Sequence, residues 1–151
     1  MRTFTSIEEL AACQGELIGR SDWVTITQEA VNLFADATGD HQWIHVDPER
    51  AASGPFGTTI AHGYMTLAML PQLMHQIYRL DGVKLAINYG LNKVRFPAPV
   101  PVGSRIRAET SVVEVADAGG GAHQVTLSTT VAIDAHAKPA CVAESVVRYL
   151  L

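Results

Sequence analysis

The amino-acid sequence predicts a single α+β domain, and three observations lead to that prediction. The chain has 151 residues, a length that suits one domain with a sizeable core. The segment from Gly63 to about Leu80 is apolar almost all round, as in a buried helix, and Pro71 should kink or break it. Several later segments alternate apolar and polar residues, which is typical of strands with one buried face. We therefore expect residues 1–151 to form one antiparallel sheet covered by the helix.

Three shorter helices are expected before the apolar segment, because each begins with a capping pattern. The first follows Ser6, with a glutamate three residues later, as in a capping box. The second follows Thr27 and ends at Gly39, since glycine readily adopts the left-handed conformation that ends a helix. The third begins at Asp47, which is followed by proline at the first helical position. The segment between Gly39 and Asp47 is therefore a loop held between two helix ends.

The second half of the chain contains the expected strands. They are Lys84–Phe96, Arg105–Val112, Val125–Ile133 and a last strand from Cys141 onward. A glycine-rich turn is expected at Asp117–Gly121. Long strands joined by short turns favour antiparallel pairing.

Composition excludes several classes of partner. The formal net charge is −4 and no run of Lys or Arg is present, so nucleic acid is not an expected partner. No stretch approaches the roughly 18 to 20 apolar residues that span a bilayer. Met1–Arg20 has no apolar core of a signal peptide. Cys13 and Cys141 lack the spacing of a metal or redox motif, so we expect two reduced thiols in a cytoplasmic protein.

The loop between the two helix ends carries Asp40 and His45. On a regular helix an offset of five residues places two side chains about 140° apart, so they would not meet. A turn between two fixed helix ends can bring them to one point. Histidine is the usual proton carrier near neutral pH, and a neighbouring carboxylate can orient it or share a water with it. Taken by themselves, however, the two residues are more often a solvated aspartate and a structural histidine.

A second feature is Gly63, at the start of the apolar helix. The first N–H groups of a helix lack partners within it and lie at the positive end of its dipole. A carbonyl oxygen that gains negative charge can be held there, and glycine has no side chain to block its approach. The alternative is a structural glycine that permits close packing.

A metal site is not expected. His41 and His45 are four residues apart and Asp40 is adjacent, but the residues between the histidines supply no general base of the HExxH kind. No third ligand lies at a useful spacing.

Five motifs follow one another in a fixed order along the chain: Thr38-Gly39-Asp40, Ile44-His45-Val46-Asp47-Pro48, Pro55-Phe56-Gly57, Ala61-His62-Gly63 and Lys93–Val100. In this order they resemble the MaoC-like (R)-specific enoyl-CoA hydratases of the hotdog fold, and most of all their single-domain mycobacterial (3R)-hydroxyacyl-thioester dehydratases. The resemblance covers nearly the whole chain.

The resemblance implies a fold, a reaction and roles for individual residues. In a hotdog fold the sheet wraps around the helix that begins at Gly63. Asp40 and His45 match the catalytic dyad, which holds and activates one water, and Gly63 matches the N–H of the oxyanion hole. The implied reaction is reversible syn addition of water to trans-2-enoyl thioesters, in fatty-acid metabolism. The family usually forms homodimers, and it needs no metal or redox cofactor, because coenzyme A is only the carrier of the substrate.

Further residues are candidates for binding an acyl-CoA or acyl-carrier-protein substrate. Trp43 stands where the family often has proline, and we expect it to reshape the acyl pocket. The other substrate-binding candidates are Ala61, His62, Tyr64, Asn88 and Tyr89. The candidates for binding the phosphates of coenzyme A are Lys93 and Arg95, followed by Arg105 and Arg107.

Two other functions are compatible with the same fold. A hotdog thioesterase would also bind acyl-CoA but would attack its carbonyl, and a non-catalytic protein would only bind acyl thioesters. The intact Asp40/His45 pair favours the hydratase over both. The sequence leaves open the acyl chain length, the physiological direction and which of the two residues is the base.

Overall fold

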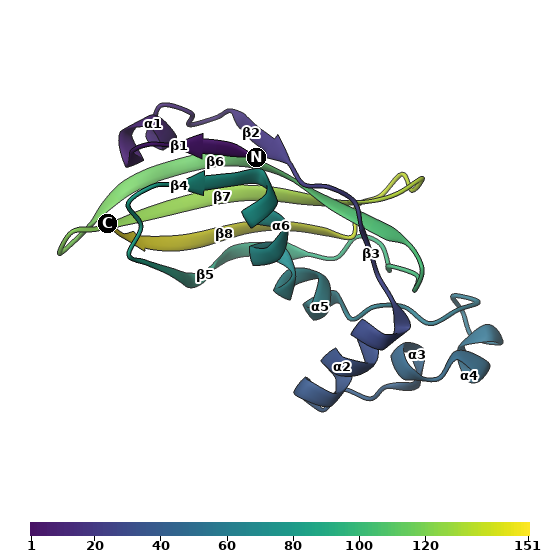
Figure 1. The fold of residues 1–151 in the computed structure, drawn as a ribbon. Helices are drawn as coiled ribbons and strands as arrows, with labels where there is room; N and C mark the ends of the chain where they lie inside the picture. Colours follow the sequence, from purple (N-terminus) through teal and green to yellow (C-terminus); the bar gives the residue numbers. More distant parts are fainter.

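A six-stranded antiparallel sheet curls around a helical segment in the computed structural model, which describes all 151 residues (Figure 1). The helices are α1 (Ile7–Ala11), α2 (Gln28–Thr38), α3 (Trp43–Val46), α4 (Pro48–Ala52), α5 (Gly63–Ala68) and α6 (Leu70–Ile77). The strands are β1 (Arg2–Phe4), β2 (Leu17–Arg20), β3 (Val24–Thr25), β4 (Tyr78–Leu80), β5 (Leu85–Arg95), β6 (Arg105–Gly119), β7 (Ala122–Ile133) and β8 (Cys141–Leu150). The predicted α+β class is confirmed. No helix is long and apolar enough to cross a membrane.

The sheet has the strand order β2-β6-β7-β8-β5, and β3 also pairs with β6. Consecutive strands β6, β7 and β8 form antiparallel hairpins, while β5 pairs with β8 and lies at the edge. The predicted strands are therefore confirmed, but β6 extends beyond Val112 to Gly119. Register shifts after Val112 and after Asp117 act as bulges, and they let the strand continue where its alternation is lost. The glycine-rich turn is accordingly shorter than predicted.

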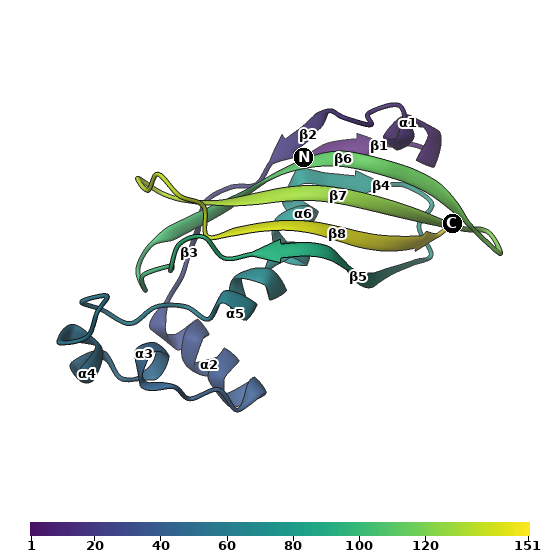
Figure 2. The same ribbon diagram turned by 180° about the vertical axis from the view of Figure 1, so that it is seen from behind.

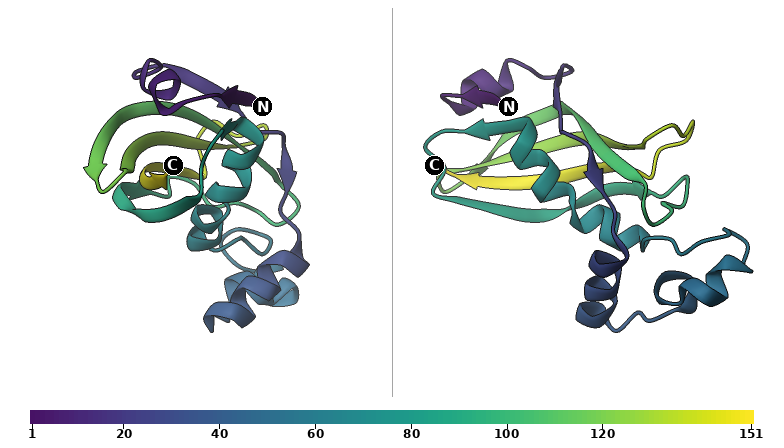
Figure 3. Two further views of the ribbon diagram at one scale, coloured as in Figure 1. Left: turned by 60° about the vertical axis from the view of Figure 1, so that its left-hand side comes forward. Right: turned by 45° about the vertical axis from the view of Figure 1, so that its right-hand side comes forward.

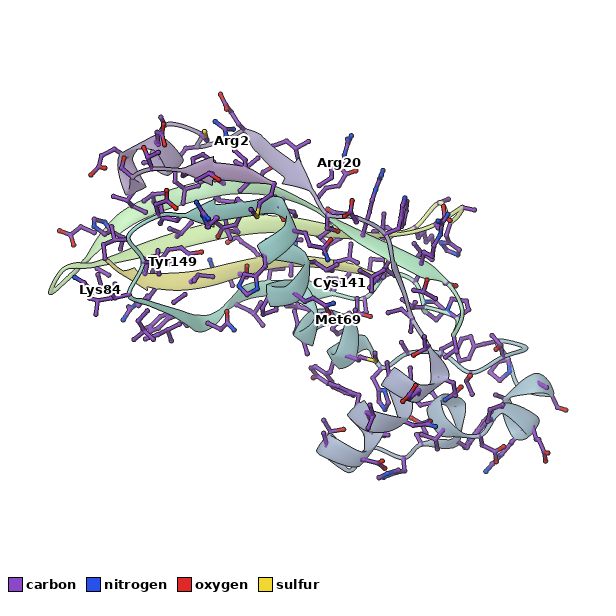
Figure 4. The ribbon with its side chains drawn as sticks, in the orientation of Figure 1. Arg2, Arg20, Met69, Lys84, Cys141 and Tyr149 are labelled. Atoms are coloured by element: carbon purple, nitrogen blue, oxygen red, sulfur yellow. The ribbon has the colours of Figure 1, made fainter.

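The central helical segment is divided into α5 and α6 at Met69 (Figure 4). Pro71 lies in the first turn of α6, where its missing N–H leaves no hydrogen bond unmade. The predicted break is thus confirmed, but the predicted helix end at Leu80 is wrong. From Tyr78 the chain is extended and forms β4, because β1 provides a parallel partner for its backbone.

The sheet curls around α6, as the left panel of Figure 3 shows, and the buried core side chains lie between the two. Its fully buried side chains include Leu73 and Ile77 from α6, Ile106 from β6, and Leu127 and Val131 from β7. These strand residues follow the predicted alternation. Full burial of each such side chain stabilises the fold by about 1.5–3 kcal/mol.

Helices α2, α3 and α4 lie together beyond one end of the sheet, in both opposite views (Figures 1 and 2). All the predicted caps are present. Ser6 Oγ accepts the Glu9 N–H, Thr27 Oγ1 accepts the Ala30 N–H and an Asp47 carboxylate oxygen accepts the Arg50 N–H. Gly39 ends α2 with a φ of 79°, in the left-handed region. This α2–α4 lobe carries Asp40 in the turn after α2 and His45 in α3. The predicted loop between Gly39 and Asp47 is therefore wrong in part, because Trp43–Val46 forms a one-turn helix.

Candidate active site

The end of α2 fixes the backbone of Asp40. The Thr38 hydroxyl donates to the Phe34 carbonyl at 2.8 Å and accepts the Asp40 N–H at 3.5 Å. One carboxylate oxygen of Asp40 accepts the Gln42 N–H at 3.4 Å. The side chain is 54% exposed, so its other oxygen can reach a solvent-sized ligand.

His45 is held in a defined tautomer inside the one-turn helix α3. Its Nδ1 lies 2.7 Å from the Ile60 carbonyl oxygen. Because a carbonyl can only accept, Nδ1 carries the proton and Nε2 keeps a free lone pair. The Ile60 N–H in turn donates to the Ile44 carbonyl at 3.0 Å, and the Gln28 amide donates to the His45 carbonyl at 2.7 Å. Hydrogen bonds from Ile60, before α5, and from Gln28, in α2, thus hold α3 in place.

Burial keeps His45 neutral. The imidazole is 7% exposed, and burial lowers its pKa from the ordinary value of 6.5. The Ile60 carbonyl and the Asp40 carboxylate oppose this shift, while His62 adds to it. One carboxylate oxygen of Asp40, one ring nitrogen of His45 and one ring nitrogen of His62 all lie within 4.8 Å of one another. The structure therefore brings together the two predicted residues and adds a third.

Gly63 is the first residue of α5, and its N–H has no acceptor among the backbone and side chains. It lines a cavity of about 330 Å³ together with His45, Thr66 and Phe96. The Phe96 ring lies against it so closely that a Cβ on Gly63 would be 3.0 Å from the ring. Close packing at this glycine is therefore observed, whereas the role of its free N–H in binding a carbonyl oxygen stays a prediction.

A larger cavity, of about 730 Å³, lies between α5–α6 and strands β5 and β8. Most of its lining is apolar, and Leu67 of α5 contributes to it one turn after Gly63. The polar exceptions include Asn88 and Tyr149, and Tyr149 is labelled on β8 in Figure 4. The two cavities thus meet the same helix α5, where Thr66 lines the smaller one and Leu67 the larger one.

Sequence and structure comparisons match this arrangement to one family. The family model of the MaoC like domain matches residues 10–134. The chain belongs to the MaoC-like dehydratase family. It is 75% identical over 150 residues, 99% of both chains, to the 3-hydroxyacyl-thioester dehydratase Z of Mycobacterium tuberculosis. It is 41% identical over 140 residues, 91% of this chain and 87% of the other, to the nodulation protein N of Rhizobium leguminosarum bv. viciae.

Solved MaoC-like structures have the same fold. The unliganded R-hydratase from Pseudomonas aeruginosa superposes with a TM-score of 0.71 at 26% identity, covering 86% of this chain and 79% of that one. The (R)-hydratase from A. caviae gives a TM-score of 0.71 at 26% identity, covering 87% and 95%. The predicted family, the hotdog fold and the dehydratase class of enzyme are confirmed.

Trp43 does not shape either cavity of this MaoC-like domain. Its ring packs on Gly54, where an added Cβ would lie 2.9 Å away, and the Arg50 guanidinium lies 4.4 Å from the ring centroid. The expectation that Trp43 reshapes the acyl pocket is wrong within this chain, because α3 turns the side chain toward α4. Trp43 instead stabilises the α2–α4 lobe.

The other substrate-binding candidates divide into residues that line a cavity and residues that do not. Ala61 lines the smaller cavity and Asn88 the larger one. Tyr64 is 73% exposed and contacts the edge of Phe96. Tyr89 does not line the cavity that Asn88 lines; adjacent strand residues point to opposite faces, and the Arg148 guanidinium lies 3.5 Å from the Tyr89 ring centroid.

The basic candidates fall into two pairs. Lys93 and Arg95, on edge strand β5, are exposed and have no carboxylate partner. Arg105 pairs with Asp134, and Arg107 lies over the Trp23 ring. The first pair is therefore free to bind phosphate, whereas the second is engaged within the protein.

The hydrogen bonds of the histidines near Asp40 determine which of their ring nitrogens could coordinate a metal ion. Nε2 of His62 lies 2.9 Å from the Asp40 carbonyl oxygen and so carries a proton. His41, the other histidine near the loop, pairs with Asp36 at the surface at 2.8 Å. His45 Nε2 and the buried His62 Nδ1 each keep a lone pair, so the structure adds His62 as a third potential ligand that the sequence spacing did not predict.

Sequence reasoning missed two groups that build the site. Ile60 sets the His45 tautomer through its carbonyl, and Gln28 supports α3 from one helix earlier. Neither has a sequence signal, because every residue has a carbonyl and glutamines are common on helices.

Proposed function

We propose that this chain is an (R)-specific enoyl-CoA hydratase, equivalently a (3R)-3-hydroxyacyl-thioester dehydratase, that acts in fatty-acid metabolism. The observation that carries the proposal is the neutral, buried His45 whose free Nε2 lies beside the Asp40 carboxylate. Such a pair can hold one water between two acceptors. Gly63 offers an unpaired N–H to the cavity that His45 lines, where a thioester carbonyl can accept it.

In the hydration direction His45 is the base. Its Nε2 removes a proton from the water while the water oxygen attacks C3, and the Asp40 carboxylate accepts the other hydrogen of that water. The electrons of the double bond move onto the thioester carbonyl, and C2 then takes the proton back from His45. Because water and proton come from one side of the alkene, the addition is syn. Dehydration follows the same steps in reverse.

Gly63 stabilises the negative charge that forms on the carbonyl oxygen. Its N–H is preorganised by α5 and by the Phe96 ring packed against its Cα. A donor of this kind contributes about 100- to 1,000-fold in rate. The reaction moves a proton and a water with no net oxidation, so it needs no redox cofactor. The Gly63 N–H polarises the carbonyl in this proposal, which is the task a metal would otherwise perform.

The acyl tail and the carrier occupy different surfaces in this proposal. The tail enters the larger cavity, whose volume of about 730 Å³ and apolar lining suit an alkyl chain. The phosphates of coenzyme A, or of an acyl-carrier protein, lie near Lys93 and Arg95. We place the enzyme in the cytoplasm, since both cysteines are free and buried, as is usual in a reducing compartment.

The edge strand β5 supports a homodimer. Its apolar side chains Leu85, Ile87 and Tyr89 are 48–56% exposed, and its outer edge has no strand partner. Long exposed edges invite pairing with another chain, and a two-fold axis would join two β5 edges into one continuous sheet. Light scattering should give twice the chain mass. Ile87→Lys should shift the equilibrium toward monomer, and a monomeric wild type at all concentrations would refute the proposed dimer.

The enzymatic proposal is tested with trans-2-enoyl-CoA esters of several chain lengths. The absorbance of the conjugated enoyl group should fall on hydration without release of free thiol, and the product should be the (3R)-hydroxyacyl ester. Asp40→Asn and His45→Gln should each lower the rate by about 100- to 10,000-fold. His41→Gln is the matched control, because His41 is a neighbouring surface histidine outside both cavities, and it should keep the wild-type rate.

Other outcomes would assign one of the competing functions. Release of free thiol from the ester would show a thioesterase. Binding of acyl-CoA with no conversion at any chain length, from coenzyme A or from acyl-carrier protein, would show a non-catalytic binder. A wild-type rate in either dyad variant would remove Asp40 or His45 from the mechanism.

A further inference from the structure

His62 is a buried histidine for which the mechanism above has no role. It is 3% exposed and lines neither cavity, although the sequence placed it among substrate-binding residues. Its Nε2 donates to the Asp40 carbonyl at 2.9 Å, and its Nδ1 is buried without any hydrogen-bond partner. An unpaired buried nitrogen is uncommon, so the place of this ring in the site calls for an explanation.

The ring of His62 packs directly on the ring of His45. The two centroids are 3.8 Å apart and the planes differ by 24°, so the imidazoles are stacked. The Phe34 ring also packs on His62, and the two ring centroids are 5.0 Å apart. His62 thus stands between α2 and α3 and touches both members of the dyad.

We propose that His62 is a positioning residue that sets the geometry of the Asp40/His45 dyad. Its N–H fixes the Asp40 backbone, and its flat ring fixes the plane in which the His45 lone pair lies. Asp40 and His45 are the titratable side chains that face it. His62 therefore acts as a flat ring with one donor.

Two substitutions separate the two parts of this role. His62→Phe keeps a flat ring and removes the donor to Asp40, whereas His62→Gln keeps a donor and removes the stacked ring. Each should lower kcat by about 10- to 100-fold, since displacement of a catalytic group by about 1 Å has effects of this size. KM should stay near the wild-type value. His41→Gln again serves as the control.

The pH dependence distinguishes positioning from a purely structural role. Because His62 contributes to the lowered pKa of His45, its replacement by phenylalanine should raise that pKa. The acid limb of kcat/KM should then move to higher pH. Folded His62→Phe protein with an unchanged kcat and an unchanged acid limb would overturn the proposal, and a raised KM with unchanged kcat would show a substrate-binding residue instead.

The inference rests on the proposed function, so one measurement is made without substrate. The His45 ring is titrated by NMR in wild type and in His62→Phe. An upward shift supports the contact between the rings even if no enoyl ester is converted, in which case only the proposed function fails. An unchanged His45 titration, together with conversion by the wild type, refutes the role of His62 alone.

Discussion

The α2–α4 lobe and the sheet around α6 are held together by different forces. In the lobe, hydrogen bonds between polar groups fix the site, such as the 2.7 Å contact from His45 to the Ile60 carbonyl. In the sheet, fully buried apolar residues such as Leu127 and Ile106 hold the strands and α6 together. Hydrogen bonds are directional, whereas apolar packing depends mainly on area and volume. The lobe therefore governs chemistry, and the sheet governs stability and the space for the acyl chain.

The largest expected effect is on rate, in the lobe. His45→Asn keeps an amide donor near the Nδ1 position, toward Ile60, but removes the base at Nε2. The rate of hydration should fall by about 100- to 10,000-fold while the thermal unfolding midpoint stays close to wild type. His45→Gln should lose as much rate and, without a donor in that position, be less stable by about 1 kcal/mol. Equal stability of the two variants would contradict the importance of the Ile60 contact.

A substitution in the core of the sheet should instead lower the stability and leave kcat nearly unchanged. Ile106 lies fully buried on β6 and lines neither cavity, so Ile106→Ala should lower the free energy of unfolding by about 2–5 kcal/mol. Urea denaturation measures this change. The kcat of the remaining folded protein should be near the wild-type value, and a large drop in kcat would show that the two regions are coupled.

Gly63 lies where the two regions meet, and its substitution should affect both to a smaller extent. In Gly63→Ala the new methyl group meets the Phe96 ring at 3.0 Å, so the start of α5 or the ring must shift. We expect kcat/KM to fall by about 10- to 100-fold. The double variant Gly63→Ala/Phe96→Leu relieves the contact. Recovery of rate would assign the glycine to packing, while no recovery would assign it to the approach of the carbonyl.

The smallest expected effect concerns pH. Burial lowers the pKa of His45 from 6.5, and the neutral form is the base. The neutral form is lost as pH falls through this lowered pKa, so kcat/KM for hydration should be constant above about pH 6.5 and fall only below it. A rate profile across this range measures the shift. An acid limb above the ordinary imidazole value would mean that His45 is not buried as described.

Short-range features of the chain were predictable because nearby residues cause them. The caps at Ser6, Thr27 and Asp47 depend on contacts within three residues, and the strand alternation depends on neighbours two residues apart. The ordered motifs around Asp40 and Gly63 also sufficed to predict the family and the hotdog fold.

Only the tertiary structure decided how these residues are used. The tautomer of His45 depends on a carbonyl 15 residues away, and His62 meets Asp40 from 22 residues away. Tyr78 lies in β4 rather than in the predicted helix, because β1, which is distant in the sequence, pairs with it. Trp43 turned toward Gly54 rather than the cavity. The sequence by itself determined local conformation and which residues carry the chemistry. Long-range packing alone determined which side chains meet and which ring nitrogen holds the proton, because both depend on contacts between distant segments.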